Sequence, residues 1–346
     1  MPGYGARGNS VAIDQGGGAR DTPIMKALVV SELAADFAGC ALADVPDPVR
    51  VAGQVLIRVR AASLNFPDLL MTEGKYQLKP DLPFVPGMEV AGEVVAADRD
   101  SGFAAGDAVV AGTRLGGFAE FVTVDARSVR AIPANLDYAR AASVGAAYNT
   151  AYVALGRCAN VQPGEWVVVH GATGGVGLAA VDLAKALGCR VIATSRSADK
   201  LAIVARHYAP DAMLIAPGFR EAVKELAGGG ADVIYDPVGG DVFDESTRCI
   251  GFGGRLLVIG FTSGRIATVP TNIPLIKGFS VIGVRAGEYG RQFPDKGREN
   301  LDAIWALAAE GRIRPRVDMR YPLTDWRTAF EAMRDSRVVG KIVIEP

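Results

Sequence analysis

The sequence predicts an α/β protein with two domains: a compact, barrel-like β domain and a doubly wound domain built around a six-stranded parallel sheet. The chain has 346 residues, and domains commonly hold roughly 100–200 residues. Short strand patterns punctuated by glycine fill its first part. From about residue 147 onward, strands alternate with helical patterns, which is typical of parallel α/β sheets.

Composition and charge narrow the class of function. Lysine and arginine number 37 and the acidic residues 38, giving a formal net charge of −1, which argues against nucleic acid as the main partner. Hydrophobic residues make up 49% and charged residues 22%, as in a globular protein with a large core. No apolar run approaches the roughly 20 residues of a membrane helix. We therefore expect a cytoplasmic protein that acts on a small molecule, with no nucleic-acid or membrane partner.

The cysteines are too scattered to form a zinc site. Four occur far apart in the sequence, with no C-x-x-C pair and no neighbouring histidine cluster: Cys40, Cys158, Cys189 and Cys249. A zinc site built from cysteine and histidine needs three or four such ligands. We expect buried, reduced thiols and no metal.

Residues 1–24 differ from the rest of the chain. They contain Gly16-Gly17-Gly18 and scattered charges, and they lack the apolar stretch of a secretory signal. We expect a flexible extension, with the folded part beginning at Met25.

Residues 25–147 carry the strand patterns of the β domain. Val55, Ile57 and Val59 alternate with Arg58 and Arg60, so that one face of this strand is apolar. Further short apolar runs follow at 90–96, 107–111 and 118–124. Many short strands at this spacing predict a barrel-like domain.

Residues 148–285 change to the α/β pattern. Strands are expected at 166–170, 190–194, 213–215, 233–235, 256–259 and 280–284. Val176, Ala180, Leu183 and Leu187 recur at helical spacing after the first of them. Such alternation predicts a doubly wound sheet. The apolar last strand would lie at its edge, where it invites pairing with a second chain, and we expect a homodimer.

Residues 286–346 are expected to return to the β domain and make it discontinuous. Helices are predicted at 300–310 and 325–335, the second with Thr324 as its N-cap. The final strand, 341–344, has the pattern of the first domain.

The loop after the first strand of the α/β domain carries a dinucleotide-binding fingerprint. Read as A-x-G-x-x-G, Ala172 permits the tight turn, Gly174 lets the backbone approach a pyrophosphate, and Gly177 lets the helix pack closely. The pyrophosphate would lie at the helix N-terminus, where free N–H groups favour an anion. The whole loop supplies the expected contacts: Ala172, Thr173, Gly174, Gly175, Val176 and Gly177.

The end of the second strand indicates which dinucleotide binds. NAD sites usually place an acidic residue there for the ribose 2′-hydroxyl. Here the sequence reads Ser195-Arg196-Ser197, with Lys200 one turn later. A guanidinium suits a 2′-phosphate, so NADPH is the expected cofactor, with Ser195, Arg196 and Lys200 at the phosphate.

Several motifs in order resemble the medium-chain dehydrogenases/reductases, in their zinc-free quinone oxidoreductase (zeta-crystallin-like) branch. The resemblance spans about 25–346 and rests on these segments: Ala62-Ser63-Leu64-Asn65-Phe66-Pro67-Asp68, Gly74-Lys75-Tyr76, Pro86-Gly87-Met88-Glu89-Val90-Ala91-Gly92, Thr150-Ala151-Tyr152, the Gly171–Gly177 loop, Asp236-Pro237-Val238-Gly239-Gly240 and Gly340-Lys341-Ile342-Val343. It implies a GroES-like catalytic domain over 25–147 and 286–346, a Rossmann domain over 148–285, and an active site in the cleft between them.

The same resemblance marks a departure from the zinc-dependent alcohol dehydrogenases of the superfamily. Asn65 stands where they carry a catalytic cysteine, and their Gly-His-Glu motif reads Gly87-Met88-Glu89 here. The structural zinc loop with its four cysteines is missing as well. Without a Lewis-acid metal, oxidation of an alcohol is disfavoured, whereas an electron-poor acceptor can take a hydride directly.

The resemblance also assigns site residues. It places Asn65 and Asp68 near the nicotinamide and Tyr76 in the substrate pocket, and we take these three as the catalytic candidates. At the cofactor it places Thr150, Gly260, Phe261 and Lys341. Related enzymes often have a tyrosine near the end of the third strand, where this chain reads Leu214-Ile215-Ala216. His170 and Glu89 are expected to be structural.

The function expected first is NADPH-dependent reduction of a conjugated acceptor, a quinone before others. An enoyl thioester such as acryloyl- or crotonyl-CoA is the alternative, because relatives of that kind use a tyrosine in a G-x-Y context as proton donor, and Gly74-Lys75-Tyr76 fits. A non-enzymatic role, as a lens crystallin or RNA binder, is a further alternative that the net charge and the intact fingerprint disfavour.

Overall fold

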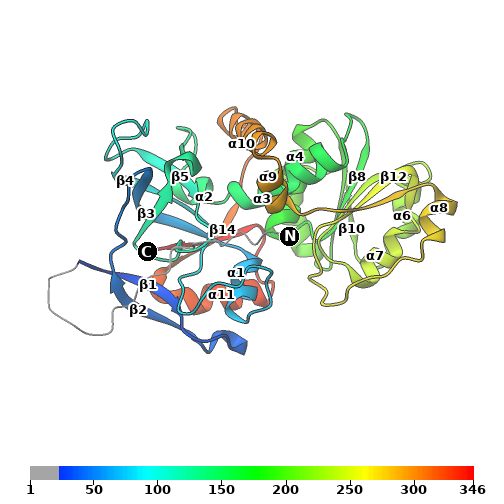
Figure 1. Cartoon of the computed structure of the whole chain (residues 1–346). Helices are drawn as coiled ribbons and strands as arrows, with labels where there is room; N and C mark the ends of the chain where they lie inside the picture. The colour runs from blue at the N-terminus through cyan, green and yellow to red at the C-terminus, as the bar shows by residue number, and fades with distance from the viewer. Residues whose placement is uncertain (1–22) are drawn as a thin grey trace. The chain divides into compact units, whose positions relative to one another are not determined.

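The computed structural model describes residues 23–346, which form two compact units (Figure 1). The first unit runs to Ala146 and resumes at Val317–Pro346, and the second spans Ala147–Arg316. Most of the extension expected at 1–24 lies outside the described residues. The first strand begins at Ile24, one residue before the expected start of the fold.

The first unit is built on a seven-stranded sheet in the order β14-β15-β3-β4-β5-β7, with β6 paired to β3. β1 and β2 form a separate antiparallel pair. The strands are β1 Ile24–Val30, β2 Cys40–Pro46, β3 Gln54–Leu64, β4 Glu89–Ala96, β5 Ala108–Gly112, β6 Phe121–Asp125, β7 Val129–Ala131, β14 Val317–Pro322 and β15 Lys341–Glu345. The helices are α1 Phe66–Thr72, α2 Tyr138–Ala142 and α11 Trp326–Arg334, with short 3-10 turns at Ala35–Phe37, Ala126–Ser128 and Leu323–Asp325.

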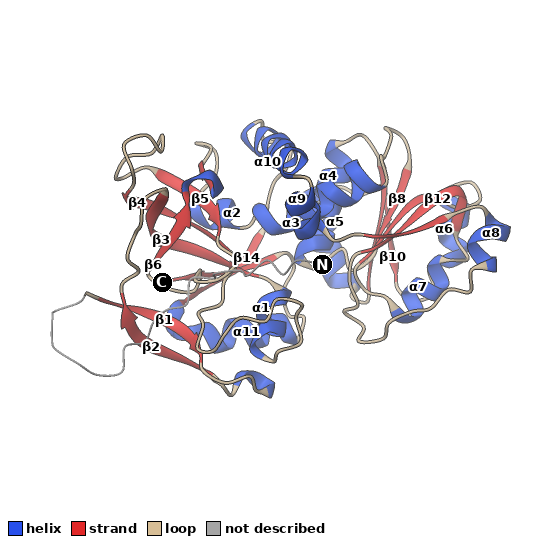
Figure 2. Cartoon of the chain, in the orientation of Figure 1, coloured by secondary structure: helices blue, strands red, loops and turns tan. Residues whose placement is uncertain are grey.

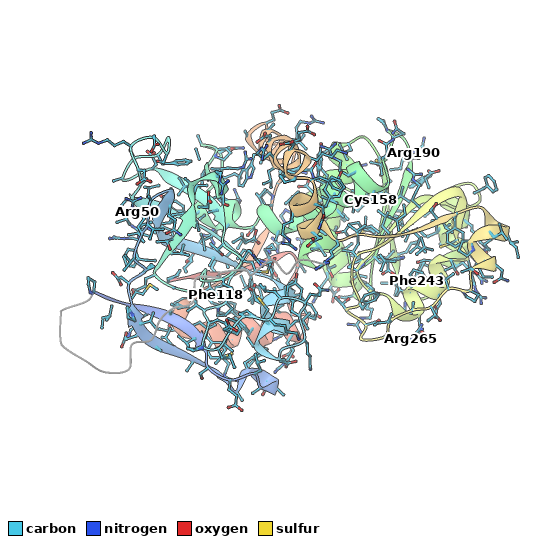
Figure 3. The ribbon with its side chains drawn as sticks, in the orientation of Figure 1. Arg50, Phe118, Cys158, Arg190, Phe243 and Arg265 are labelled. Atoms are coloured by element: carbon cyan, nitrogen blue, oxygen red, sulfur yellow. The ribbon has the colours of Figure 1, made fainter. Side chains whose placement is uncertain are left out.

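The apolar face of β3 forms the centre of the first core. Val55, Ile57 and Val59 are buried while Arg58 and Arg60 are exposed, as the alternation predicts. Phe118, labelled in Figure 3, packs edge-on against Phe330 of α11. The C-terminal segment therefore belongs to this core, and the chain returns to the first unit at Val317.

The second unit holds a six-stranded parallel sheet in the order β10-β9-β8-β11-β12-β13, with helices on both of its faces (Figure 2). Its strands are β8 Trp166–Val169, β9 Arg190–Ser195, β10 Ala212–Ile215, β11 Ala231–Asp236, β12 Ile250–Val258 and β13 Ser280–Gly283. Its helices are α3 Gly145–Tyr152, the π-helix Val153–Cys158 (η3), α4 Gly175–Ala186, α5 Ala198–Tyr208, α6 Arg220–Leu226, α7 Gly240–Ser246, α8 Asn272–Lys277, α9 Ala286–Gln292 and α10 Pro294–Ala309. The doubly wound sheet predicted from the alternation is confirmed.

Residues 286–316 lie with the second unit, unlike the predicted boundary, which places them in the β domain. Polar contacts explain the difference. Arg157 Nε donates to Asn300 Oδ1 on α10 (2.7 Å), and the Arg314 N–H donates to buried Asp182 on α4 (2.5 Å). The chain therefore crosses to the first unit only after Arg316.

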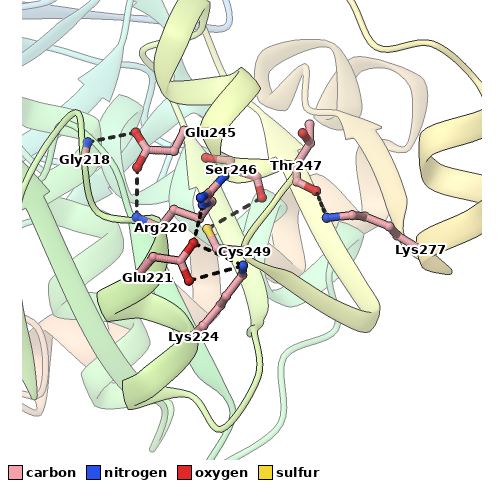
Figure 4. A network of polar contacts seen from close by, with 9 residues as sticks. All are labelled: Gly218, Arg220, Glu221, Lys224, Glu245, Ser246, Thr247, Cys249 and Lys277. Atoms are coloured by element: carbon pink, nitrogen blue, oxygen red, sulfur yellow. Dashed lines mark hydrogen bonds and ion pairs between the residues drawn. The ribbon is translucent and has the colours of Figure 1, made fainter.

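Two local details are visible only in the structure. Glu245 on α7 accepts N–H bonds from Gly218 (2.9 Å) and Arg220 (2.8 Å), and so covers the N-terminus of α6 (Figure 4). The N-cap of α11 is Asp325, not the predicted Thr324, because a 3-10 turn occupies Leu323–Asp325.

All four cysteines are free thiols; Cys40, Cys189 and Cys249 are buried and Cys158 is partly exposed. Among the described residues, no helix is both long and apolar enough to cross a lipid bilayer.

Candidate functional site

The carboxyl edge of the parallel sheet gathers the predicted cofactor residues that follow its strands. The strand order reverses between β8 and β11, and nucleotides bind at such a point in doubly wound sheets. The loop after β8 contacts the loop after β11, since a Cβ built on Gly171 would lie 3.4 Å from Pro237 and Val238. The fingerprint loop and the Asp236–Gly240 segment therefore line the same edge.

The fingerprint glycines lie at the turn into α4 and differ in how tightly they are packed. Gly174 is the N-cap residue of α4. A Cβ on Gly177 would lie 2.2 Å from the Gly171 carbonyl oxygen, so only glycine fits there, whereas one on Gly174 would meet nothing closer than 3.5 Å. The open space at Gly174, beside the free N–H groups of the first turn, leaves a place for an anion.

The end of β9 lies beside this loop. The Thr173 and Ser195 hydroxyls are 3.3 Å apart, and Ser197 caps α5 by accepting the Lys200 N–H. Arg196 is exposed and forms no hydrogen bond or ion pair with the part of the chain that the structure describes. The structure thus brings Thr173 and Ser195 together, places Lys200 in the first turn of α5, and leaves the Arg196 guanidinium available to a ligand.

Gly260 and Phe261 follow β12 and border the same edge. The Gly260 N–H points to the Asp236 carbonyl (3.4 Å), and Phe261 packs against Gly239. The neighbouring loop after β11 is held by the Asp236 carboxylate, which accepts the N–H groups of Val238 (2.8 Å) and Gly239 (2.9 Å). The Asp236–Gly240 sequence motif alone does not indicate that Asp236 stabilises this loop. Thr150 is partly buried on α3.

His170 is structural, as expected. It is fully buried, and its ring nitrogens contact the hydroxyls of Thr194 (2.8 Å) and Ser246 (2.9 Å). Because Ser246 already donates to the Val242 carbonyl, it accepts from His170, which places the ring proton on Nε2. Burial lowers the pKa of His170 to about 3, so the ring stays neutral.

Two of the three catalytic candidates, Asn65 and Asp68, lie in or beside a buried polar cluster made of Asn65, Glu89 and Lys341. Residues 65 and 341 are neighbours because β15 pairs with β3 in the register Ile342↔Leu64. Glu89 begins β4 on the other side of β3. Lys341 was predicted to approach the cofactor; its ammonium lies inside this cluster.

Charge determines which way the Asn65 amide faces. Lysine only donates and a carboxylate only accepts, so Asn65 Oδ1 faces Lys341 Nζ (2.6 Å) and Nδ2 faces Glu89 Oε1 (3.0 Å). The second Nδ2 hydrogen goes to the Ser63 carbonyl (3.2 Å). Both amide hydrogens of Asn65 are therefore used within the protein.

Glu89 is the centre of the cluster. Its Oε1 accepts from Asn65 and from Lys341 (3.1 Å), and its Oε2 accepts the Ala146 N–H (2.7 Å). The structural hydrogen bond expected of Glu89 is present. Its pairing with Lys341 joins residues 252 positions apart, a contact for which the sequence carries no local signal.

Asp68 lies beside the cluster, in the first turn of α1, and is fully buried. Its carboxylate accepts the N–H groups of Asn65 (2.8 Å), at the start of α1, and of Gly87 (3.1 Å). Burial raises the pKa of Asp68 to about 7, against the two N–H bonds and the nearby Lys341 charge. Through these contacts Asp68 stabilises the first turn of α1, which is a structural role and not a catalytic one.

Tyr76 stands apart from the cluster. It is partly buried against the core of the first unit, and its hydroxyl forms no hydrogen bond with residues 23–346. The phenol therefore remains a candidate donor to a ligand.

The residues at the position expected for zinc do not fit that metal. The Lys341 ammonium occupies the space between Asn65 Oδ1 and Glu89 Oε1, and Met88 packs against the core. Among residues 23–346, no three His, Cys, Asp or Glu side chains are grouped so as to hold a metal ion. Zinc independence itself stays a prediction.

Two family models match the chain. The one described as an alcohol dehydrogenase GroES-like domain matches residues 51–134, and the one described as a zinc-binding dehydrogenase matches residues 175–304. The first match lies within the first structural unit and the second within the α/β unit.

Similar proteins cover most of the chain. The quinone oxidoreductase-like protein 2 homolog of Nematostella vectensis is 38% identical over 298 residues, which are 84% of this chain and 81% of the relative. Quinone oxidoreductase-like protein 2 of Bos taurus is 36% identical and covers 86% of each chain.

Solved structures agree with the fold. A probable oxidoreductase from Mycobacterium abscessus has a TM-score of 0.85 at 38% identity, over 94% of this chain and 100% of its own. A mycobacterial protein solved in complex with NADPH has a TM-score of 0.84 at 31% identity, over 93% and 100%. The Thermus thermophilus quinone oxidoreductase, also studied with NADPH, has 0.80 at 30% identity, over 93% and 100%.

Proposed function

The chain belongs to the quinone oxidoreductase family of medium-chain dehydrogenases/reductases, and from this membership we propose that it is an NADPH-dependent reductase of conjugated acceptors, a quinone first among them. The observation that carries the proposal is the nucleotide edge of the second unit. There, Gly174 and Gly177 open the N-terminus of α4, and Arg196 extends from the end of the next strand.

The cofactor residues fit NADPH. The space beside Gly174 and the α4 N–H groups would hold the pyrophosphate. Arg196, supported by Ser195 and Lys200, would bind the 2′-phosphate, and Gly260 and Phe261 would border the cofactor. Two relatives of known structure were solved with NADPH, which supports this choice.

For this reaction the protein mainly has to position the dinucleotide and the acceptor. The reduced nicotinamide supplies a hydride when it is bound. The chain's own residues hold the dinucleotide, through the fingerprint loop, and supply the polar cluster of Asn65, Glu89 and Lys341 in the first unit. An electron-poor acceptor needs no Lewis acid, and this suits a site whose cation is the Lys341 ammonium.

A quinone is preferred over an enoyl thioester because the two lysines near Tyr76 already have hydrogen-bonding partners within the chain. Lys75 forms an ion pair with Glu73 (2.6 Å), and Lys79 Nζ donates to the Gly74 carbonyl. Both lysines would have to exchange these contacts to bind the phosphates of a CoA chain. One observation still supports an enoyl thioester as the substrate: the Tyr76 hydroxyl has no hydrogen-bond partner among residues 23–346. Thioester reduction therefore remains the second candidate function.

A panel of acceptors tests the proposal. Purified protein would be given NADPH with several quinones, with crotonyl-CoA and with acryloyl-CoA, and NADPH oxidation followed at 340 nm. We expect quinone turnover well above thioester turnover. Efficient crotonyl-CoA reduction with slow quinone reduction would replace the first candidate with the second, and no NADPH oxidation with any acceptor would favour a non-enzymatic role.

The NADPH preference is tested by Arg196→Ala. A charge-assisted hydrogen bond contributes about 1.5–3 kcal/mol, which corresponds to about tenfold to over a hundredfold in affinity. We expect the variant to raise the KM for NADPH by this factor and to leave the KM for NADH nearly unchanged. An equal effect on both cofactors would show that Arg196 does not contact the 2′-phosphate.

A further inference from the structure

The hydrogen-bond count in the Asn65–Glu89–Lys341 cluster leaves one donor unused. Asn65 Nδ2 has two hydrogens, and they go to Glu89 and to the Ser63 carbonyl. Lys341 Nζ has three hydrogens, of which two go to Asn65 Oδ1 and Glu89 Oε1. The third has no acceptor among residues 23–346. The side chain that can still donate to a ligand is therefore the lysine.

The cluster also holds this donor in one place. Lys341 lies at the first residue of β15, fixed by pairing with β3 on one side and β14 on the other. Its ammonium is bonded to two acceptors that are themselves fixed, since Glu89 is bonded to Ala146 and Asn65 to Ser63. Asn65 is 8% exposed and Lys341 5%, so bulk water has little access. A preorganised donor of this kind stabilises charge that develops on a substrate oxygen.

We propose that Lys341 is a catalytic residue, whose third N–H binds and protonates the acceptor oxygen, and that Asn65 and Glu89 are positioning residues for its ammonium. This inference rests on the proposed reductase function and deepens it. It changes the assignments carried by the family resemblance, in which Asn65 belongs to the catalytic set and Lys341 contacts the cofactor.

The step balances with the components of that reaction. The acceptor gains a hydride, with its electron pair, from the reduced nicotinamide, which becomes oxidised. One carbonyl oxygen of the acceptor thereby takes up the displaced electron pair as an oxyanion. That oxygen then forms a bond to the proton of Lys341 as the N–H bond breaks. The neutral amine regains a proton from solvent after the reduced acceptor has left the site.

Lys341→Met is the direct test, because methionine keeps the length of the side chain and removes all three donors. Two quantities are measured: kcat with a quinone at saturating NADPH, and the Kd of NADPH from its fluorescence without acceptor. Loss of an oxyanion donor costs about 10²–10³ in kcat. We expect that loss, with the Kd of NADPH changed less than about threefold. Lys26→Met, which removes an exposed lysine paired with Asp44, is the matched control and should behave as wild type.

The outcomes separate the roles. If kcat at saturating NADPH is retained while Kd rises, Lys341 is a cofactor-binding residue and the inference is overturned. It is also overturned if neither quantity changes. If the wild-type protein itself oxidises no NADPH with any quinone, the proposed function fails instead.

A second variant covers the case in which Lys341→Met does not fold, because it leaves Glu89 buried without its cation. Lys341→Met/Glu89→Gln removes both charges together, and circular dichroism shows whether it is folded. It should still lack quinone turnover, and recovery of wild-type kcat would overturn the inference. Failure of both variants to fold would likewise count against it, since Lys341 would then serve to hold the fold.

The positioning role of Asn65 has its own readout. Asn65→Ala should lower kcat in the wild-type background and should lower it no further in the Lys341→Met background, because it acts through the lysine. Additive losses would contradict that role.

Discussion

At the scale of single residues, the charged neighbours of Asn65 determine which of its amide atoms donate and which accept a hydrogen bond. An asparagine at position 65 could donate or accept. The lysine on one side and the carboxylate on the other determine that its oxygen faces Lys341 and its nitrogen faces Glu89. Both neighbours arrive from distant parts of the sequence. The motif around Asn65 therefore indicates where the site lies but not which atom of it acts.

Asp68 gives a pH-dependence to the stability of this region. Its pKa in the folded protein is raised from 3.8 to about 7 by burial. Below pH 3.8 the group is protonated in both states. As the pH rises toward 7, the unfolded chain ionises it first, so the folded state loses the corresponding stability, and the loss levels off above pH 7. The asparagine of Asp68→Asn does not titrate and serves as the reference. The difference in the free energy of unfolding, wild type minus Asp68→Asn, should fall between about pH 4 and 7 and stay constant above pH 7. Denaturant melts across this range measure it, and a difference that rises with pH would contradict the assignment.

Tyr76 distinguishes the two substrate classes. Reduction of an enoyl thioester needs a proton placed on carbon, and general acid catalysis contributes about 10²–10⁴-fold. Quinone oxygens receive protons more easily, and Lys341 is the proposed donor. We expect Tyr76→Phe to lower kcat with a quinone by less than about tenfold. Loss of a crotonyl-CoA activity in this variant, with normal NADPH binding, would instead identify the protein as a thioester reductase.

At the scale of elements, periodicity predicts most strands and helices, and the misses have local causes. β12 runs over Ile250–Val258 rather than 256–259, because Gly251, Gly253 and Gly254 interrupt the apolar pattern that marks a strand. α10 begins at Pro294, six residues before its predicted start, since the polar first turn carries no apolar periodicity. The pairing of Lys341 with Asn65 and Glu89 depends on strand register, which no local pattern contains.

The fingerprint helix yields a prediction with an internal control. Gly177→Ala drives a methyl group against the Gly171 carbonyl at 2.2 Å, and overpacking of this kind costs typically about 1–3 kcal/mol. We expect a Tm lower by several degrees. The methyl group of Gly174→Ala meets nothing closer than 3.5 Å, so this variant should have a Tm near that of the wild type. The same methyl group would fill the anion position, and we expect it to weaken NADPH binding by about tenfold or more, equivalent to about 1.4 kcal/mol. Thermal melts and NADPH titrations of the pair check both claims, which fail if the two variants behave alike.

At the scale of the whole molecule, the second unit ends in a strand edge that has no partner within the described chain. β13 pairs with β12 on one side only. Large apolar side chains are exposed on and near it: Phe252, Leu275, Ile276 and Val281. An open apolar edge invites pairing with an identical strand, and the homodimer predicted from the sequence would bury it.

Light scattering tests the homodimer. We expect a mass near twice the 36.2 kDa of one chain at micromolar concentration. Val281→Lys should shift the mass toward the monomer by placing a charge on the edge. Met213→Lys places the same charge on β10, the opposite edge of the sheet, where Met213 is also exposed, and should leave the dimer intact. A monomeric wild-type protein would exclude this assembly.

We propose that this chain transfers a hydride from NADPH to a quinone without a metal, with the Lys341 ammonium as the cation of the site. The most direct measurement is NADPH oxidation with a quinone by protein whose metal content has been reduced with a chelator and checked by elemental analysis. We expect full turnover, and slower turnover with NADPH deuterated at the transferred position. Activity that disappears with about one zinc ion per chain and returns when zinc is restored would contradict the claim.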